Sequence, residues 1–190
     1  MNILKKPKVF LISGPSGVGK DTVIDIIKKE YTNFHYVITA VTREPRQNEK
    51  NGLNHFFLTD NEFTNLIKNN QLLEWSKVYK NYYGVPKDQI YKPLNEGKNV
   101  LLRVDVQGAK KIKEILPDII MIFIQPESID SIKNHLLARE IKSESDIKTR
   151  LDSFESEMKY SKHFDHIITN IEHKIEYVVS DVKDIIDAHI

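Results

Sequence analysis

The residues best suited to chemistry lie near the N-terminus, in the stretch VFLISGPSGVGKDT, residues 9–22. An apolar segment leads into a glycine-rich turn and a helix start, and Gly14, Gly19 and Lys20 fit the pattern G-x-x-x-x-G-K. Glycines let backbone N–H groups close around phosphate oxygens, and the helix start and the lysine add positive charge. Asp21 and Thr22 follow, where the pattern has one Ser or Thr. The stretch predicts a binding loop for a nucleoside triphosphate.

A second polar cluster is TREPRQNEKNG, residues 42–52. Arg43 and Arg46 lie three residues apart around Pro45, and Glu49 follows three residues later. Two arginines on a stiffened loop suit the bidentate binding of a phosphate other than those of the triphosphate. The alternative is a solvated charged loop.

A third cluster is LLEWSKVYKNYYGVP, residues 72–86. Glu74 stands in an apolar setting, where a carboxylate needs hydrogen-bond donors that a purine amino group and ring N–H would supply. A structural salt bridge is the alternative for Glu74. Tyr83 offers a phenol, and Trp75 is predicted to pack in the core.

Two further features bear on phosphoryl transfer. The segment NVLLRVDVQGA, residues 99–109, has the form of a strand that ends in an acid, Asp105, and holds Mg²⁺ or its water. Arg139 and Arg150 lie on successive predicted helices and can close over a transferring phosphoryl group. Solvated surface arginines are the alternative reading of that pair.

Strands and helices must position these residues, and their alternation predicts an α/β fold. We expect a parallel-sheet α/β core with an inserted lobe near residues 35–95. Strands are predicted at 9–13, 36–40, 54–58, 72–79, 82–85, 99–106, 119–124 and 165–169. Helices are predicted at 20–30, from Asp60, from Gly108 to the residue before Pro117, and at 129–139, 143–160 and 172–188.

Composition limits the possible classes of protein. The chain has 190 residues, of which 40% are hydrophobic and 29% charged, as in an ordinary globular domain. A net charge of +1 gives no bulk attraction to nucleic acid or membrane. The absence of cysteine excludes disulfides, thiolate metal sites and a cysteine nucleophile. The first residues are too few and too charged for a signal peptide, so a cytoplasmic location is expected.

Taken in this order, the clusters resemble those of guanylate kinases, which transfer a phosphoryl group from ATP to GMP. The resemblance runs from about Pro7 to Asp187 and rests on GPSGVGK, on TREPR followed by Glu49 and Gly52, and on LLEW, YYG and VDVQGA. Adenylate and thymidylate kinases lack this combination. It implies a P-loop parallel-sheet core with helices on both faces, an inserted mixed α/β GMP-binding lobe and a helical lid. These parts would form a single domain, residues 1–190, with the core at about 1–34, 96–135 and 163–190, the GMP-binding lobe at about 35–95 and the lid at about 136–162.

The resemblance also implies the roles of individual residues. ATP would be bound by Gly14, Pro15, Ser16, Gly17, Val18, Gly19, Lys20, Asp21 and Thr22, with Asn170 near the adenine. GMP would be bound by Thr39, Arg43, Arg46, Glu49, His55, Glu74, Tyr83, Val85 and Asp105. Asp105 and Thr22 would hold Mg²⁺, directly or through water. Lys20, Arg43, Arg139 and Arg150 would neutralise the transferring phosphoryl group, and the enzyme would be a monomer or a homodimer.

Five positions depart from the usual pattern of that family. Asp21 stands where many members have Ser, Thr or Gly, and Arg103 replaces the first acid of an Asp-x-Asp strand. Val85 replaces a hydroxyl residue, and His135 sits where a lid arginine is common. His55 replaces a Tyr, which predicts that GMP affinity depends on pH.

Two other functions stay open at this point. The same fold also serves as a catalytically silent protein-interaction module, and a Lys-Asp pair in the loop also resembles kinases of ribose bisphosphate. The intact loop with Lys20 favours an enzyme over the silent module. Glu49, Glu74 and Tyr83 favour a guanine nucleotide as the acceptor.

Overall fold

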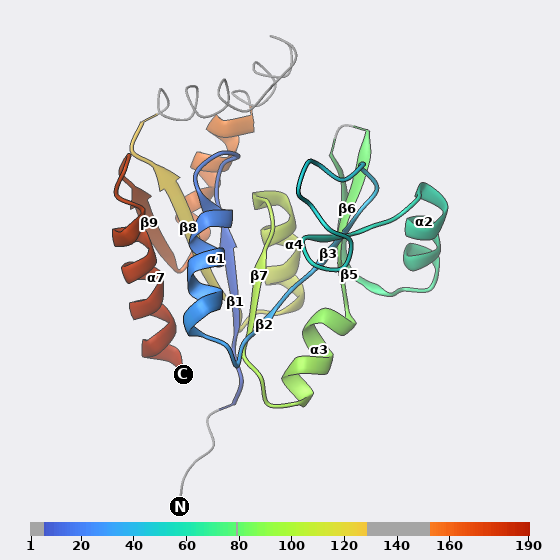
Figure 1. The fold of residues 1–190 in the computed structure, drawn as a ribbon, viewed down its shortest axis with the longest axis horizontal. Coiled ribbons are helices and arrows are strands. Elements are labelled where there is room, and N and C mark those ends of the chain that lie inside the picture. The colour runs from blue at the N-terminus through green and yellow to red at the C-terminus, as the bar shows by residue number, and fades with distance from the viewer. Residues whose placement is uncertain (1–5, 79, 129–152) are drawn as a thin grey trace, which may run out of the picture. The chain divides into compact units, whose positions relative to one another are not determined.

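The computed structural model describes residues 6–78, 80–128 and 153–190 (Figure 1). These residues form two compact units, each described here by itself. The mixed-sheet unit comprises Met1–Val9, Asn33–Leu102 and Gln107–Ile119 in their described parts. The phosphate-loop unit comprises Phe10–Thr32, Arg103–Val106 and the described residues of Ile120–Ile190.

The phosphate-loop unit is built on parallel strands. The strands β1 (Val9–Ser13), β8 (Ile120–Pro126) and β9 (His166–Asn170) pair in parallel with β8 in the middle. Most side chains of β1 and β8 are buried, as expected of strands covered on both faces. The segment after β7 also reaches β1, because the Val104 N–H donates to the Ile12 carbonyl at 3.4 Å.

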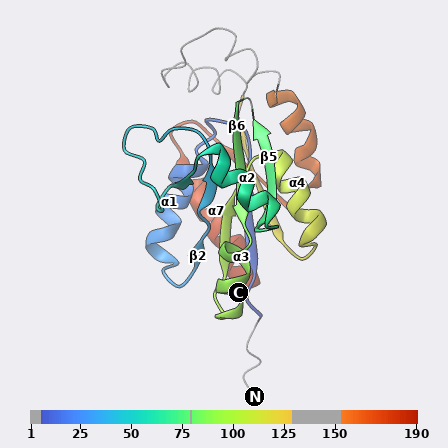
Figure 2. The same ribbon diagram turned by 90° about the vertical axis from the view of Figure 1, so that its right-hand side faces the viewer.

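Helices cover both faces of this sheet (Figure 2). α1 (Lys20–Glu30) and α7 (Ile175–His189) lie on one side, and they are joined by a hydrogen bond of 2.7 Å from the Tyr31 hydroxyl to Asp187. The helical residues 153–160 lie on the other side and lead into the 3₁₀ turn η1 (Ser161–His163). The fully buried helical side chains in this core include Val23, Ile27, Val178, Val182 and Ile186.

The mixed-sheet unit contains a four-stranded sheet. Its strands, in order across the sheet, are β4 (His55–Phe57), β3 (Thr39–Val41), β6 (Asn81–Pro86) and β5 (Leu72–Val78). β3 and β4 are parallel, and the other two pairs are antiparallel. The helix α2 (Asp60–Lys68) lies against this sheet, where Phe63 packs with Ala40 and Leu72 (Figure 2).

The rest of the mixed-sheet unit is a parallel pair of strands with two helices. β2 (His35–Tyr36) pairs in parallel with β7 (Val100–Arg103). The helices are α3 (Asp88–Asn95) and α4 (Val106–Ile115). Together the parallel strands and their helices confirm the expected α/β class.

Several element boundaries differ from the prediction. The strand expected at 36–40 is divided into β2 and β3, because the Ile38 N–H bonds to the side chain of Gln89 at 3.1 Å instead of to a strand. α2 begins at Asp60, as predicted, and its N-cap is Thr59: Thr59 and Glu62 each accept a backbone N–H from the other, which forms a capping box.

Two helices were placed wrongly or missed. α4 begins at Val106 and not at Gly108, so the strand before it ends earlier than expected. α3 was not predicted, because Pro93 stands inside a segment only eight residues long. The helix predicted at 129–139, and the first part of the one predicted at 143–160, lie outside the described residues.

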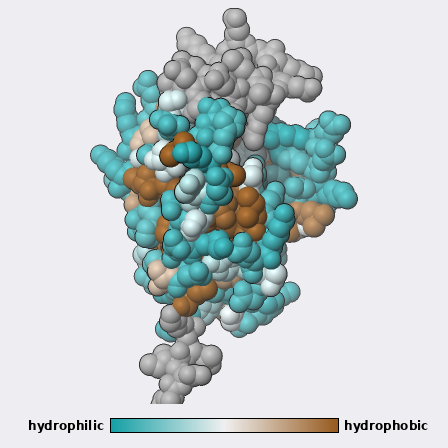
Figure 3. All heavy atoms as spheres, turned by 60° about the vertical axis from the view of Figure 1, so that its left-hand side comes forward, coloured by the Kyte–Doolittle hydropathy of each residue, from teal (hydrophilic) through white to brown (hydrophobic). Residues whose placement is uncertain are grey.

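The surface carries no continuous apolar band in the view of Figure 3, where hydrophobic residues are scattered among hydrophilic ones. Within the described residues, every helix is too short or too polar to cross a membrane.

Candidate active site

The predicted phosphate loop comprises the turn from Gly14 to Gly19 between β1 and α1 and the first residues of α1, Lys20 to Thr22. Gly14 has φ +143°, and a Cβ at this position would collide with the Ile124 carbonyl of β8. Gly19, the N-cap of α1, has φ +94° and lies within reach of the Asn170 side chain. The path of the loop therefore requires glycine at both positions.

Lys20 folds back over this loop. Its Nζ donates to the carbonyl oxygens of Gly14 at 2.5 Å and Pro15 at 2.8 Å. These bonds hold the ammonium group over the turn, beside the N-terminus of α1, where a bound anion would meet a full and a partial positive charge.

Asn170 links the end of β9 to the loop. Its Nδ2 donates to the Val18 carbonyl at 2.9 Å. Its Oδ1 is buried and accepts no hydrogen bond from the described residues. The amide therefore supports the loop through one atom and keeps an acceptor for another group.

Glu157 is a member of this site that sequence reasoning missed. Burial raises the pKa of its carboxyl to about 7, while the Lys20 charge opposes that shift and the Asp105 charge adds to it. Lys20, Asp105 and Glu157 thus interact electrostatically within one unit. Spacing gives only part of the signal: Glu157 lies three residues after Phe154, which is buried, but the tertiary fold is what brings its carboxyl near Lys20 and Asp105.

Asp21 and Arg103 form an ion pair in the same unit. Asp21 stands in the first turn of α1 and Arg103 at the end of β7. Both positions depart from the family pattern, and sequence reasoning treated them as separate features.

In the mixed-sheet unit, residues 42–52, which we call the arginine loop, are held together by hydrogen bonds to the Glu49 carboxylate. Arg43 donates from Nη1 and Nη2 to the two carboxylate oxygens at 2.6 and 2.7 Å, and the Arg46 backbone N–H donates to the same carboxylate at 2.8 Å. The bonds from Arg43 lower the pKa of Glu49 to about 2, and the same contact raises the pKa of Arg43, as does Tyr83. Arg46 itself is exposed.

His55 is the first residue of β4, which follows this loop in the chain, and it is 7% exposed. Its Nδ1 shares a hydrogen bond of 2.7 Å with the Thr39 hydroxyl. Burial, helped by the nearby Arg43 charge, lowers the pKa of His55 to about 4. The imidazole is therefore neutral near pH 7, and the dependence of GMP affinity on pH stays a prediction.

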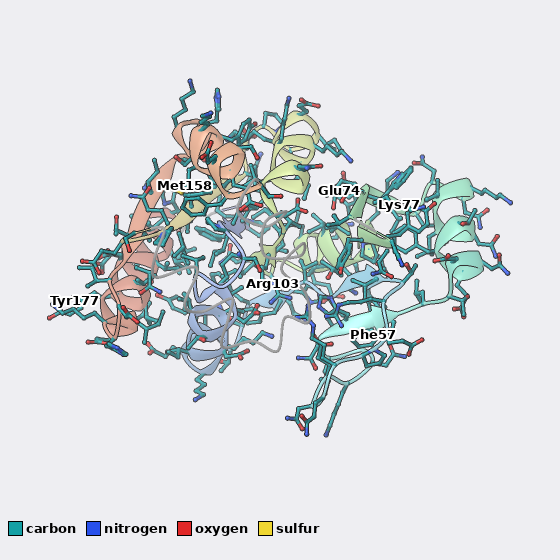
Figure 4. All side chains as sticks on the ribbon, turned by 90° about the horizontal axis from the view of Figure 1, so that it is seen from above. Phe57, Glu74, Lys77, Arg103, Met158 and Tyr177 are labelled. Atoms are coloured by element: carbon teal, nitrogen blue, oxygen red, sulfur yellow. The ribbon has the colours of Figure 1, made fainter. Side chains whose placement is uncertain are left out.

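Glu74 and Val85 are paired on β5 and β6. The Glu74 side chain is 6% exposed, so a carboxylate is held in the interior of this unit, and Val85 is fully buried. The neighbouring Gly84 is packed closely against Phe63 and Leu72, so its lack of a side chain serves the core. Glu74 and Lys77 are labelled on their strand in Figure 4.

The structure thus divides the predicted residues between the two units. The phosphate-loop unit holds Gly14 to Thr22, Asp105 and Asn170, and the mixed-sheet unit holds Thr39, Arg43, Arg46, Glu49, His55, Glu74, Tyr83 and Val85. Arg139 and Arg150, like His135, lie outside the described residues.

Comparison with known proteins gives one consistent result. The family model of guanylate kinase matches residues 6–189. A guanylate kinase of Malacoplasma penetrans is 44% identical over 169 residues, which are 87% of this chain and 86% of the relative. One of Caldanaerobacter subterraneus is 37% identical over 188 residues, covering 99% and 90%. The crystal structure of guanylate kinase from Anaplasma phagocytophilum superposes with a TM-score of 0.77 at 25% identity, covering 97% of this chain and 86% of that one.

Proposed function

Because this chain belongs to the guanylate kinase family of enzymes, we propose that it transfers the γ-phosphoryl group of ATP to GMP and so forms ADP and GDP. The observation that carries this proposal is the phosphate loop, in which Lys20 is held by the carbonyls of Gly14 and Pro15. A silent interaction module has no need of a lysine fixed in this way. No observation favours that module or a ribose bisphosphate kinase.

ATP binds, in this proposal, with its phosphates in the loop. Backbone N–H groups from Gly14 to Thr22 and the start of α1 surround the phosphate oxygens, and Lys20 neutralises the outer ones. The buried Oδ1 of Asn170 accepts a hydrogen bond from the adenine side of the nucleotide. That hydrogen bond would satisfy Asn170 Oδ1, which receives no hydrogen bond from the described residues.

GMP binds to residues of the mixed-sheet unit. Arg43, fixed by two bonds to Glu49, grips the GMP phosphate together with Arg46 and Tyr83. His55 is neutral, and its bond to Thr39 joins β3 and β4, the strands that precede and follow this loop in the chain. Glu74 accepts hydrogen bonds from the guanine amino group and N1–H, with Thr39 beside it and the buried Val85 packed behind it in the sheet. The resemblance adds Asp105, which belongs to the phosphate-loop unit, to the base site.

The donor set fits a magnesium ion. Thr22 offers a hydroxyl in the first turn of α1, and Asp105 offers a carboxylate that interacts with the Glu157 carboxyl. Mg²⁺ prefers such oxygen ligands, keeps several waters and needs only one or two carboxylates beside nucleotide phosphates. When bound, the ion supplies charge neutralisation at the phosphates, with Asp105 and Thr22 as the residues that hold it.

The reaction needs little covalent chemistry from the protein. A GMP phosphate oxygen attacks the γ-phosphorus of ATP, the bond to the β-phosphate oxygen breaks, and ADP leaves. The attacking group is already an anion, so a strong base is not required. Lys20 and Arg43 position the phosphates and neutralise part of their negative charge. Arg139 and Arg150 of the predicted lid neutralise the rest on the transferring phosphoryl group.

The predicted division into a core, a GMP-binding lobe at 35–95 and a lid at 136–162 belongs to this proposal. Closure of the lobe and lid excludes water and protects ATP from hydrolysis. The enzyme acts in the cytoplasm on free nucleotides, as a monomer or a homodimer, in purine nucleotide metabolism.

An acceptor panel tests the proposal. Release of ADP from ATP and Mg²⁺ is measured by a coupled assay with GMP, AMP, UMP, dTMP and ribose bisphosphate as acceptors. Rapid release with GMP alone is expected. Release with ribose bisphosphate would support the second kinase, and a folded protein that is inactive with every acceptor would support the interaction module.

A further inference from the structure

Asp21 and Arg103, two departures from the family pattern, contact each other. Arg103 is labelled in Figure 4, and its Nη1 pairs with Oδ1 of Asp21. The side chains are 31% and 55% exposed. Ion pairs with such exposure add little to folding stability, so a contribution to the fold does not account for the pair.

The place of Asp21 makes it an obstacle to an anion. In α1 the Val23 N–H donates to the Gly19 carbonyl, and the amides before Val23 have no intrahelical acceptor. Their field attracts phosphate, and a carboxylate in the same turn opposes that attraction. Between Gly14 and Thr22 the charges of Lys20 and Asp21 cancel, so the loop side chains carry no net charge of their own.

Arg103, which lies outside the loop, changes the net charge around it. Its guanidinium adds one positive charge and makes a direct contact with the Asp21 carboxylate. The contact also fixes where that carboxylate lies, since a carboxylate paired with a guanidinium is held on the side of its partner.

We propose that Arg103 is a positioning residue for nucleotide binding: it holds and neutralises the Asp21 carboxylate so that the loop accepts a polyphosphate. This inference rests on the proposed function of the loop as the ATP site. Arg103 acts through Asp21 and does not itself bind phosphate. Its removal is therefore harmful only while Asp21 is present.

A double-mutant cycle tests this dependence. ADP is titrated in the presence of Mg²⁺ by calorimetry into the parent protein and into the Arg103→Ala, Asp21→Ala and doubly substituted variants. In the parent background, Arg103→Ala should weaken ADP binding about tenfold or more. In the Asp21→Ala background, the same substitution should change affinity less than about threefold. GMP affinity, measured in the same way, should not follow this pattern.

Two further variants guard the interpretation. Lys98→Ala removes an exposed cation from its ion pair with Glu96 in the other unit and should leave ADP binding at the parent value. Arg103→Lys keeps the charge and should retain most of the affinity that Arg103→Ala loses. Thermal unfolding of each variant reports whether the fold is intact. If Arg103→Ala is unfolded, Arg103→Gln, which removes the charge but keeps a polar side chain, replaces it in the cycle.

The outcomes separate the two proposals. Equal losses in both backgrounds would show that Arg103 binds the nucleotide directly and would overturn the inference. A folded Arg103→Ala variant that binds ADP as tightly as the parent would also overturn it. A parent protein that does not bind ADP would overturn the proposed function and this inference with it.

Discussion

Arg43 and Glu49 face each other with two parallel hydrogen bonds of 2.6 and 2.7 Å between guanidinium and carboxylate. The same carboxylate accepts the Arg46 backbone N–H, so one acid fixes two positions of the arginine loop. These bonds fix the plane of the Arg43 guanidinium in the absence of a bound phosphate. The guanidinium carbon Cζ also lies 5.5 Å from the centroid of the Phe57 ring. In the proposed function, Glu49 works by positioning Arg43.

Glu49→Gln tests that positioning. An amide has one acceptor oxygen and no charge, so it cannot hold the guanidinium in a bidentate pair. We expect the KM for GMP to rise about tenfold, with a much smaller change in the KM for ATP. Glu96→Gln, which weakens an exposed ion pair with Lys98, is the matched control. An equal rise in both KM values would argue against a role on the GMP side.

Lys20→Ala tests the phosphate loop. The lysine is expected to neutralise the transferring phosphoryl group, so its loss should lower kcat about 100-fold or more. Lys29→Ala, in the last turn of the same helix, changes the net charge equally and should not reduce turnover. Steady-state rates at saturating GMP make the comparison. Unchanged turnover in Lys20→Ala would remove this residue from the reacting phosphates.

Glu74→Gln tests how the base is recognised. A buried carboxylate can accept from both the amino group and N1–H of guanine, whereas an amide presents a donor to one of them. We expect GMP binding to weaken about tenfold or more, and the preference for GMP over IMP, which lacks the amino group, to shrink. Calorimetric titration of both nucleotides measures this. A loss of ATP affinity of the same size would contradict the assignment.

His55 makes folding stability depend on pH. Its pKa is about 4 in the folded protein and near 6.5 when unfolded, so the unfolded chain binds the extra proton. The resulting stability is fully present above pH 6.5 and is lost as pH falls to 4. The loss amounts to about 3 kcal/mol at most.

Glu157 opposes this trend, because its raised pKa of about 7 makes its contribution to stability disappear as pH rises. The difference between His55→Gln and the parent isolates the effect of His55. Urea unfolding measures the free energy of unfolding from pH 4 to pH 7, and this free energy should fall less steeply towards pH 4 in His55→Gln than in the parent. His173→Asn, at an exposed histidine with φ +60°, is the control and should follow the parent. Parallel curves for His55→Gln and the parent would show that His55 titrates normally.

The sequence predicted those features that depend on neighbours along the chain. The loop between β1 and α1 follows from glycines and a lysine at fixed spacing, and the Arg43–Glu49 pair joins two residues of one short loop. The α/β class follows from the alternation of apolar runs and amphipathic segments. Because these patterns are local, they can be recognised in the sequence without knowledge of the tertiary contacts.

The features that were missed depend on distant parts of the chain. Glu157 gains its raised pKa from burial near Lys20, which is 137 positions away, and Arg103 meets Asp21 across 82 positions. Trp75 was expected in the core and is 40% exposed, since alternation along β5 turns it away from the buried face of Glu74. Tertiary pairing decides the first two and leaves little trace in spacing, whereas the exposure of Trp75 follows from a local strand alternation that our prediction did not apply.

The most direct test of the proposed function identifies both products of one reaction. The purified protein is incubated with ATP, GMP and Mg²⁺, and the nucleotides are separated and quantified over time. Phosphoryl transfer predicts that ADP and GDP appear in equal amounts at equal rates, and that neither forms at a comparable rate when GMP is omitted. ADP that appears with inorganic phosphate and without GDP, or a folded protein that forms neither nucleotide, would contradict the proposed function.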